Sequence, residues 1–90
     1  MNVIIKADGS ITPYEPKNGT DYQLEEMQEI VGGWIEILYM DNDHIMVVNE
    51  EGKSNGLPIN SKATYLVQNH SRYYDVIVGD VLLCEMDKVK

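Results

Sequence analysis

The first third of the chain alternates between short apolar runs and polar turns, and this pattern predicts a hairpin. Residues 3–7 and 11–15 are the predicted strands, separated by an Asp-Gly-Ser turn at residues 8–10. Glycine accepts the positive φ that such a turn requires. Pro13 favours an edge position for the second strand, because proline cannot donate a hydrogen bond to a neighbouring strand.

A helix is predicted over residues 21–31, after the loop that follows the hairpin. Leu24, Met27 and Val31 recur at helical spacing and define its apolar face. Gly32 follows where a left-handed C-terminal residue belongs. At the other end, the sequence Thr-Asp-Tyr-Gln over residues 20–23 has the spacing of a capping box, so Thr or Asp is expected to cap the helix.

The rest of the chain predicts a hairpin, a polar loop, a second helix and a further hairpin. The strands cover residues 34–40, 45–49, 73–78 and 81–85, and the helix covers residues 60–69. Asn60 is expected to cap this second helix. The order ββαββαββ predicts an α+β fold, with a mainly antiparallel sheet built from hairpins and two helices packed on it. Such a sheet can curl into a partial barrel.

The same periodicities predict the core. The side chains expected to be mostly buried are Leu24, Met27, Val31, Ile35, Ile37, Val47, Leu66, Val78 and Leu82.

Length and composition indicate a single domain over residues 1–90. A chain this short buries roughly 60–65% of its unfolded surface. We therefore expect a ligand site to be a surface groove, a loop or, in a homo-oligomer, a subunit interface. Cys84 lies in an apolar run and is expected to be a small buried hydrophobe. No apolar run approaches the ~20 residues of a membrane span, and no secretion signal is recognisable, so a cytoplasmic location is expected.

The net charge of −8, from 15 acidic and 7 basic residues, is spread along the chain. Binding to a nucleic-acid backbone is therefore disfavoured, because it requires clustered Lys and Arg. The first predicted helix contains no basic residue and carries several carboxylates on what is expected to be its exposed side. This face is either a solvated surface or a docking surface for a basic partner, continued by the adjoining strand. The predicted partner-binding residues are Asp21, Glu25, Glu26, Glu29, Trp34 and Glu36.

The polar loop of residues 49–60 ends at the N-terminus of the second predicted helix. Free N–H groups and the helix dipole favour an anion at such a position. The loop does not have the glycine spacing of a Walker or dinucleotide-binding motif, so it is either a loop closed by an Asn cap or a contact for a nucleotide-like anion. The predicted ligand-binding residues are Asn49, Gly52, Lys53, Leu57, Pro58, Asn60, Lys62 and Thr64.

No combination of residues predicts a catalytic or metal site, and no cofactor is expected. Asp41, Asp43 and His44 are close in sequence but lack the glycine and distal Glu of a calcium loop, so they are interpreted as a turn. His44 and His70 have no Cys or His at zinc spacing. Neither Ser54 nor the cysteine lies in a recognisable nucleophile motif.

Several short motifs, taken in order, resemble a family of small proteins of phages, prophages and other mobile elements of bacteria, catalogued as a domain of unknown function. The resemblance spans nearly the whole chain. The similar segments are Val3-Ile4-Ile5-Lys6, Glu29-Ile30-Val31-Gly32-Gly33, residues 45–53, Gly56-Leu57-Pro58-Ile59-Asn60 with Ala63-Thr64, and residues 77–82. The resemblance implies an accessory role exerted by binding, and it transfers no catalytic residue.

Two functional hypotheses follow, and an enzyme is a third with no residue set behind it. The leading hypothesis is a non-catalytic phage or mobile-element accessory protein that binds a host component through its acidic surface, with counter-defence as the expected setting. The alternative is a small module that sequesters a nucleotide-like anion at the loop before the second helix.

Overall fold

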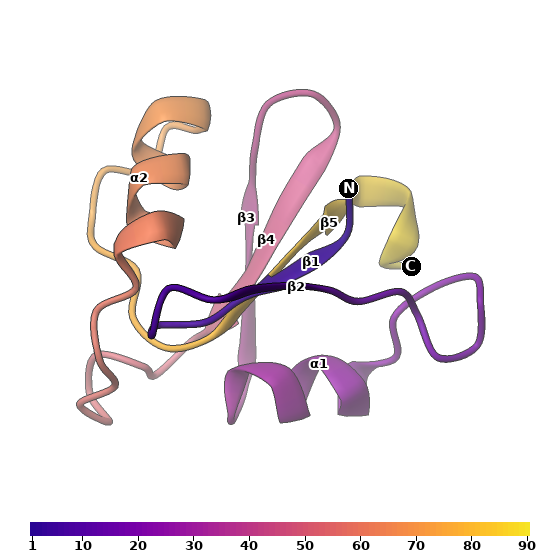
Figure 1. Cartoon of the computed structure of the whole chain (residues 1–90), viewed down its shortest axis with the longest axis horizontal. Coiled ribbons are helices and arrows are strands. Elements are labelled where there is room, and N and C mark those ends of the chain that lie inside the picture. The colour runs from indigo at the N-terminus through magenta and orange to yellow at the C-terminus, as the bar shows by residue number, and fades with distance from the viewer.

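The computed structural model describes residues 1–90 as one antiparallel sheet with a helix on each face (Figure 1). The elements are β1 (Val3–Ile5), β2 (Ile11–Pro13), α1 (Leu24–Val31), β3 (Ile35–Tyr39), β4 (His44–Asn49), α2 (Ser61–His70), β5 (Val81–Glu85) and the 3-10 turn η1 (Met86–Lys88). The five strands lie in the order β2-β1-β5-β4-β3, and every neighbouring pair is antiparallel. The fold is therefore α+β. The sheet twists strongly across the view in Figure 1 but is open, with β2 and β3 at its edges.

Successive residues of the central strands point to opposite faces of the sheet, so two separate cores form. The core under α1 contains Tyr22, Met27, Val31, Ile45, Val47, Leu82 and Cys84. The core under α2 contains Val3, Ile5, Leu38, Met46, Val48, Ala63, Val67, Ile77 and Val81. Because β4 and β5 are covered on both sides, their sequences are nearly continuous apolar runs rather than alternating ones.

The predicted first hairpin is confirmed. Val3 pairs with Pro13 and Ile5 with Ile11, and the turn between the strands has Gly9 at φ 95°. The N–H of Gly9 donates to the carbonyl of Lys6 at 2.9 Å, which closes the turn. β2 has only one neighbouring strand, so Pro13 lies in an edge strand, as predicted.

The first helix begins later than predicted, at Leu24, and the predicted cap is wrong. The side-chain oxygen of Asn18 accepts hydrogen bonds from the N–H groups of Thr20 (2.9 Å) and Asp21 (3.0 Å). The N–H of Tyr22 donates to the carbonyl of Lys88 at 2.7 Å. These contacts hold residues 20–22 outside the helix, and its N-cap residue, Gln23, makes no side-chain cap bond.

The predicted burial of Leu24 is also wrong. Leu24 opens the helix and is 47% exposed, whereas Met27 and Val31 are buried as predicted. Tyr22, which precedes the helix, is 2% exposed and fills the place in the core that was predicted for Leu24. Its hydroxyl donates to the carbonyl of Tyr14, so the polar end of this buried ring is satisfied.

Of the remaining core predictions, two are confirmed and four are only partly buried. Val47 and Leu82 on the two inner strands are buried as predicted. Ile35, Ile37, Leu66 and Val78 are only half-buried. Two of them are on β3, an edge strand that has a neighbour on one side only.

Residues 73–78, predicted as a strand, form a loop, so the observed order is ββαββαβ. Side-chain oxygens take the place of a partner strand: Thr64 Oγ1 accepts from the N–H of Ile77 at 2.8 Å, and Asp75 Oδ1 accepts from Val76 at 2.8 Å. The only pairing is an isolated bridge between Val78 and Ile59. The apolar residues that predicted a strand serve the core instead. Ile77 is 3% exposed and belongs to the core under α2.

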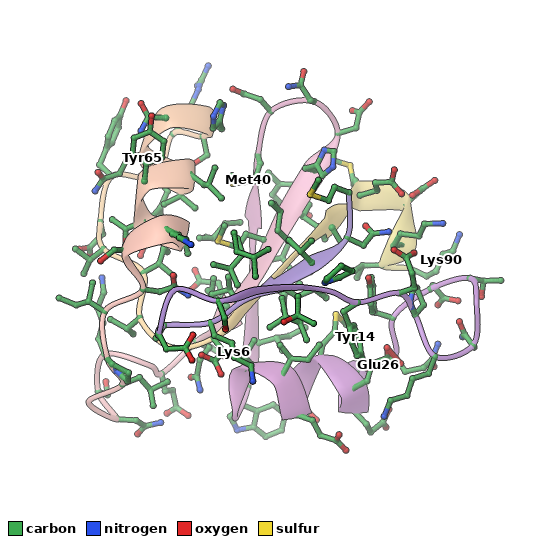
Figure 2. All side chains as sticks on the ribbon, viewed as in Figure 1. Lys6, Tyr14, Glu26, Met40, Tyr65 and Lys90 are labelled. Carbon is green, nitrogen blue, oxygen red and sulfur yellow. The ribbon has the colours of Figure 1, made fainter.

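The second helix spans residues 61–70, close to its prediction, and Asn60 caps it as predicted. The side-chain oxygen of Asn60 accepts from the N–H of Ala63 at 3.1 Å. Tyr65 projects from α2 away from the sheet (Figure 2) and is 66% exposed. Neither α1 nor α2 has the length and apolar character that crossing a bilayer requires.

Candidate functional site

The end of α1 is held against the end of β4 by one buried side chain, Asn49. Its Nδ2 donates to the carbonyl of Val31 at 3.1 Å, and its Oδ1 accepts from the N–H of Glu51 at 2.8 Å. Gly33 allows this close approach, since a Cβ at that position would lie 3.0 Å from Asn49 Nδ2. The loop that follows β4 is therefore fixed beside the last turn of α1.

This junction brings together acidic side chains that are distant in the sequence. Glu25 and Glu29 lie one turn apart on the exposed side of α1, and Glu51 faces them across a shallow depression. Trp34, 63% exposed, lines the same depression. We call these four residues, Glu25, Glu29, Trp34 and Glu51, the acidic face. The one salt bridge of the chain joins Lys53 to Asp75, so no basic side chain pairs with this face.

Three of the predicted partner-binding residues, Asp21, Glu26 and Glu36, do not belong to the acidic face. Glu26 is 5% exposed, which corrects its predicted position on the exposed side of the helix. It lies on the side of α1 that faces the preceding loop (Figure 2), where its Oε1 accepts from the N–H of Lys17 at 3.5 Å. Asp21 accepts from the hydroxyl of Thr20 at 2.7 Å and helps to form the turn before the helix.

Glu36 is exposed on β3 and faces the other side of the sheet. It is paired with Val48, so its side chain lies on the side covered by α2. A small pocket of about 150 Å³ adjoins it, with Glu50, Tyr73 and Val76 among its walls. The acidic face and this pocket lie on either side of the start of β3.

The predicted ligand-binding loop uses its polar groups to hold itself together. Asn60 is 1% exposed, and its Nδ2 donates to the carbonyls of Ile5 and Gly79, both at 2.9 Å. The hydroxyl of Thr64 donates to the carbonyl of Asn60 at 2.8 Å. Because the Asn60 oxygen also caps α2, the amide has no group left for a ligand.

The two lysines of the predicted anion site are held by different parts of the chain. Lys53 pairs with Asp75 in the loop after α2, which raises the pKa of the lysine and lowers the pKa of the carboxyl. Lys62 donates to the carbonyl of Gly9 in the first hairpin turn. The structure therefore does not bring them together at the start of α2.

The other predicted residues of this loop have packing roles. A Cβ added to Gly52 would lie 2.7 Å from Val78 Cγ2, and one added to Gly79 would lie 2.8 Å from Leu57 Cδ1. The carbonyl of Pro58 accepts from the N–H of Gly79 at 2.8 Å. These contacts join the 49–60 loop to the residues that lead into β5.

Cys84 is fully buried under α1, as predicted. Burial raises the pKa of its thiol to about 12, so the sulfur stays protonated at neutral pH and is not a nucleophile. No group of three or more His, Cys, Asp or Glu side chains is arranged to hold a metal ion.

The comparisons with known proteins identify a family over the whole chain. Residues 1–90 match the family described as Domain of unknown function (DUF3846). The chain belongs to this family. No curated protein and no solved structure matches the chain significantly. In this DUF3846 chain, the acidic face brings three unpaired carboxylates together around an exposed aromatic ring.

Sequence reasoning missed one residue of the acidic face in this DUF3846 chain, Glu51. The sequence assigns it only to the polar loop, whereas α1 carries the neighbouring carboxylates. The signal that could have found it is Asn49, whose amide can bond two separate segments at once. Asparagine at the end of an apolar strand is common at turns, so this signal has little specificity.

Proposed function

We propose that this DUF3846 chain is a non-catalytic accessory protein of a phage or another mobile element, which binds a basic surface of a host component through the acidic face. Counter-defence inhibition in the host cytoplasm is the proposed setting. The observation that carries the binding proposal is Trp34, exposed beside three unpaired carboxylates that come from two different elements.

The chemistry of this face fits a partner rich in Lys or Arg. Exposed carboxylates attract such a partner and raise its association rate. A tryptophan supplies a large rigid contact and can stack on a guanidinium or ammonium group. Glu25 and Glu29 repel each other by ~0.2–0.5 kcal/mol when no partner is present, and a bound cation removes that cost.

The phage or mobile-element origin rests on the motifs that resemble such proteins, and the binding role rests on the surface. The alternative, an anion held at the start of α2, has no structural observation in its favour. Asn60 is fully bonded within the chain and the two lysines lie apart.

The test is capture of a partner from bacterial lysate, compared between variants that differ only in where charge is removed. Replacing Glu25, Glu29 and Glu51 with Gln should release the captured partner at lower salt, and Trp34→Ala should weaken capture as well. The matched control removes the same number of charges at the other end of β4, with Asp43→Asn, Glu85→Gln and Asp87→Asn. Equal capture by the two triple variants and the parent would contradict the proposal.

A further inference from the structure

β3 is the one long sheet edge of this molecule that is left open. The other edge strand, β2, is three residues long and contains Pro13, which removes a donor from that edge. β3 spans five residues, Ile35–Tyr39, with a continuous register against β4 and no proline or lysine. Proteins usually protect such an edge with those devices, because unpaired N–H and C=O groups invite another strand.

The hydrogen-bond pattern shows which main-chain groups of β3 point outward. The carbonyl of Trp34 accepts from the N–H of Glu50 at 2.8 Å, and the N–H of Met40 donates to the carbonyl of His44 at 2.9 Å. Bonded and non-bonded pairs alternate along an antiparallel ladder, so the main-chain N–H and C=O groups of the even-numbered residues point towards β4. The N–H and C=O groups of Ile35, Ile37 and Tyr39 therefore point away from the sheet.

The side chains on the two faces of this edge differ in chemistry. Ile35, Ile37 and Tyr39 share one face, where Tyr39 is 67% exposed. Glu36 is on the opposite face, next to the pocket of about 150 Å³ that Glu50 also lines. An added strand would thus have apolar side chains on one face and basic side chains on the other.

We infer that β3 pairs with an extended segment of the partner in which basic and apolar residues alternate, so that the partner adds a strand to the sheet. This inference rests on the proposed function, because it names the way in which a basic partner is held. Trp34 immediately precedes β3, so a strand paired along β3 runs directly onto the acidic face. Main-chain bonds supply affinity in this mode, and alternate side chains supply specificity.

The charge of the chain disfavours a second copy of it as the segment that pairs with β3. Each copy has a net charge of −8. Antiparallel pairing of β3 with β3 about Ile37 would place the two Glu36 side chains at diagonal positions on one face of the sheet. Like charges at short distance across a sheet are destabilising.

The first measurement is amide hydrogen exchange of the free protein by NMR. The N–H groups of Ile35, Ile37 and Tyr39 should exchange quickly, while those of Glu36 and Leu38 should be protected. A short synthetic peptide of alternating lysine and valine should then protect the three exchanging groups, and a peptide of alternating glutamate and valine should not. Protection of the three groups in the free protein, with a dimer in sedimentation, would mean that a second copy occupies the edge and would overturn the inference.

Proline substitution separates main-chain pairing from side-chain contact. Ile37→Pro removes an N–H that points outward and leaves the ladder with β4 intact, so the peptide should bind at least about tenfold more weakly. Ile37→Ala loses the side chain but keeps the N–H, and it should bind within a few-fold of the parent. If Ile37→Pro fails to fold, Tyr39→Pro gives the same test at a more exposed position.

The outcomes distinguish this inference from the proposed function. One outcome would overturn strand addition and still support binding through the acidic face. In it, the Gln substitutions weaken peptide binding, the proline substitution leaves it unchanged, and the peptide protects none of the three amides. Failure of the parent to bind the lysine–valine peptide would also overturn strand addition. The lysate comparison would still decide the proposed function.

Discussion

Asn60 and Ile5 are joined across the fold by a hydrogen bond of 2.9 Å, from the side-chain amide of the first to the main-chain carbonyl of the second. The same amide group donates to the carbonyl of Gly79, just before β5. Asn60 thus links the start of α2 to the ends of two neighbouring strands. No buried side-chain nitrogen or oxygen in the protein lacks a hydrogen-bond partner, so removing this amide would create the defect that the fold otherwise avoids.

Asn60→Ala is expected to lower the free energy of unfolding by about 2–4 kcal/mol, since it removes a helix cap and the side-chain donor to two buried carbonyls. Urea denaturation followed by circular dichroism measures this change. Asn69→Ala is the matched control, because Asn69 lies on the same helix but is exposed and bonds only the carbonyl of Tyr65. An equal loss of stability in both variants would contradict the linking role of Asn60.

Leu24→Ala and Met27→Ala should differ sharply although both residues lie on α1. Met27 is 4% exposed and Leu24 is 47% exposed. We expect Met27→Ala to cost ~2–5 kcal/mol through loss of packing and formation of a cavity, and Leu24→Ala to cost less than about 1 kcal/mol. Thermal or urea unfolding of the pair measures which side of α1 faces the sheet. A larger loss for Leu24→Ala would mean that the helix is rotated.

Gly52→Ala should destabilise the fold by ~1–3 kcal/mol, because the new methyl group overpacks the contact with Val78. The added Cβ would lie 2.7 Å from Val78 Cγ2. Val78→Ala makes room for it, so the double variant should lose less stability than the sum of the two single variants. A double-mutant cycle measured by urea unfolding tests this coupling. Strict additivity would show that the loop and residue 78 do not touch.

Stability should fall above pH 9 because of Cys84. Burial raises the pKa of the thiol from its ordinary 9.0 to about 12, so the folded protein keeps a proton that the unfolded chain loses. The stabilisation from the protonated thiol is complete below pH 9 and decreases as the pH rises towards 12. By pH 10 the loss is on the order of 1 kcal/mol.

Cys84→Ala should make the pH dependence shallower between pH 9 and 10, although the variant is less stable overall. Above pH 10 the raised pKa of Tyr22, which burial causes, acts in the same direction, so the comparison belongs below that pH. Urea unfolding at several pH values measures both slopes. An unchanged slope in Cys84→Ala would assign the effect to another group.

The sequence predicted those elements whose signals are local. The Asp-Gly turn with Gly9 at positive φ, the Gly32 end of α1 and the Asn60 cap were each visible within a few residues, and the structure confirms them. Signals that depend on distant partners failed. Thr20 has the spacing of a capping residue, but a bond between Tyr22 and Lys88 prevents the helix from starting there. Residues 73–78 alternate like a strand, but their only pairing is the isolated bridge between Val78 and Ile59.

The candidate site was predictable only in part, for the same reason. Glu25, Glu29 and Trp34 could be grouped because they lie within one helix and the strand that follows it. Glu51 could not, because its place depends on the bonds of Asn49 to α1 and to the loop. Glu26 was misplaced because helical spacing shows which residues share a face but does not show which loop covers its border.

The central place of β5 has a consequence for how the protein is made. Val81–Glu85 pairs with β1 on one side and with β4 on the other, so the two earlier hairpins share no sheet until this late segment arrives. An isolated hairpin is at best marginally stable in water. A ribosome releases β1 to β4 before β5. Until β5 is made, one side of β1 and one side of β4 have no partner strand. We therefore expect the sheet to form only after β5 has been made, at the slower rate of chains whose strand pairings are distant in sequence.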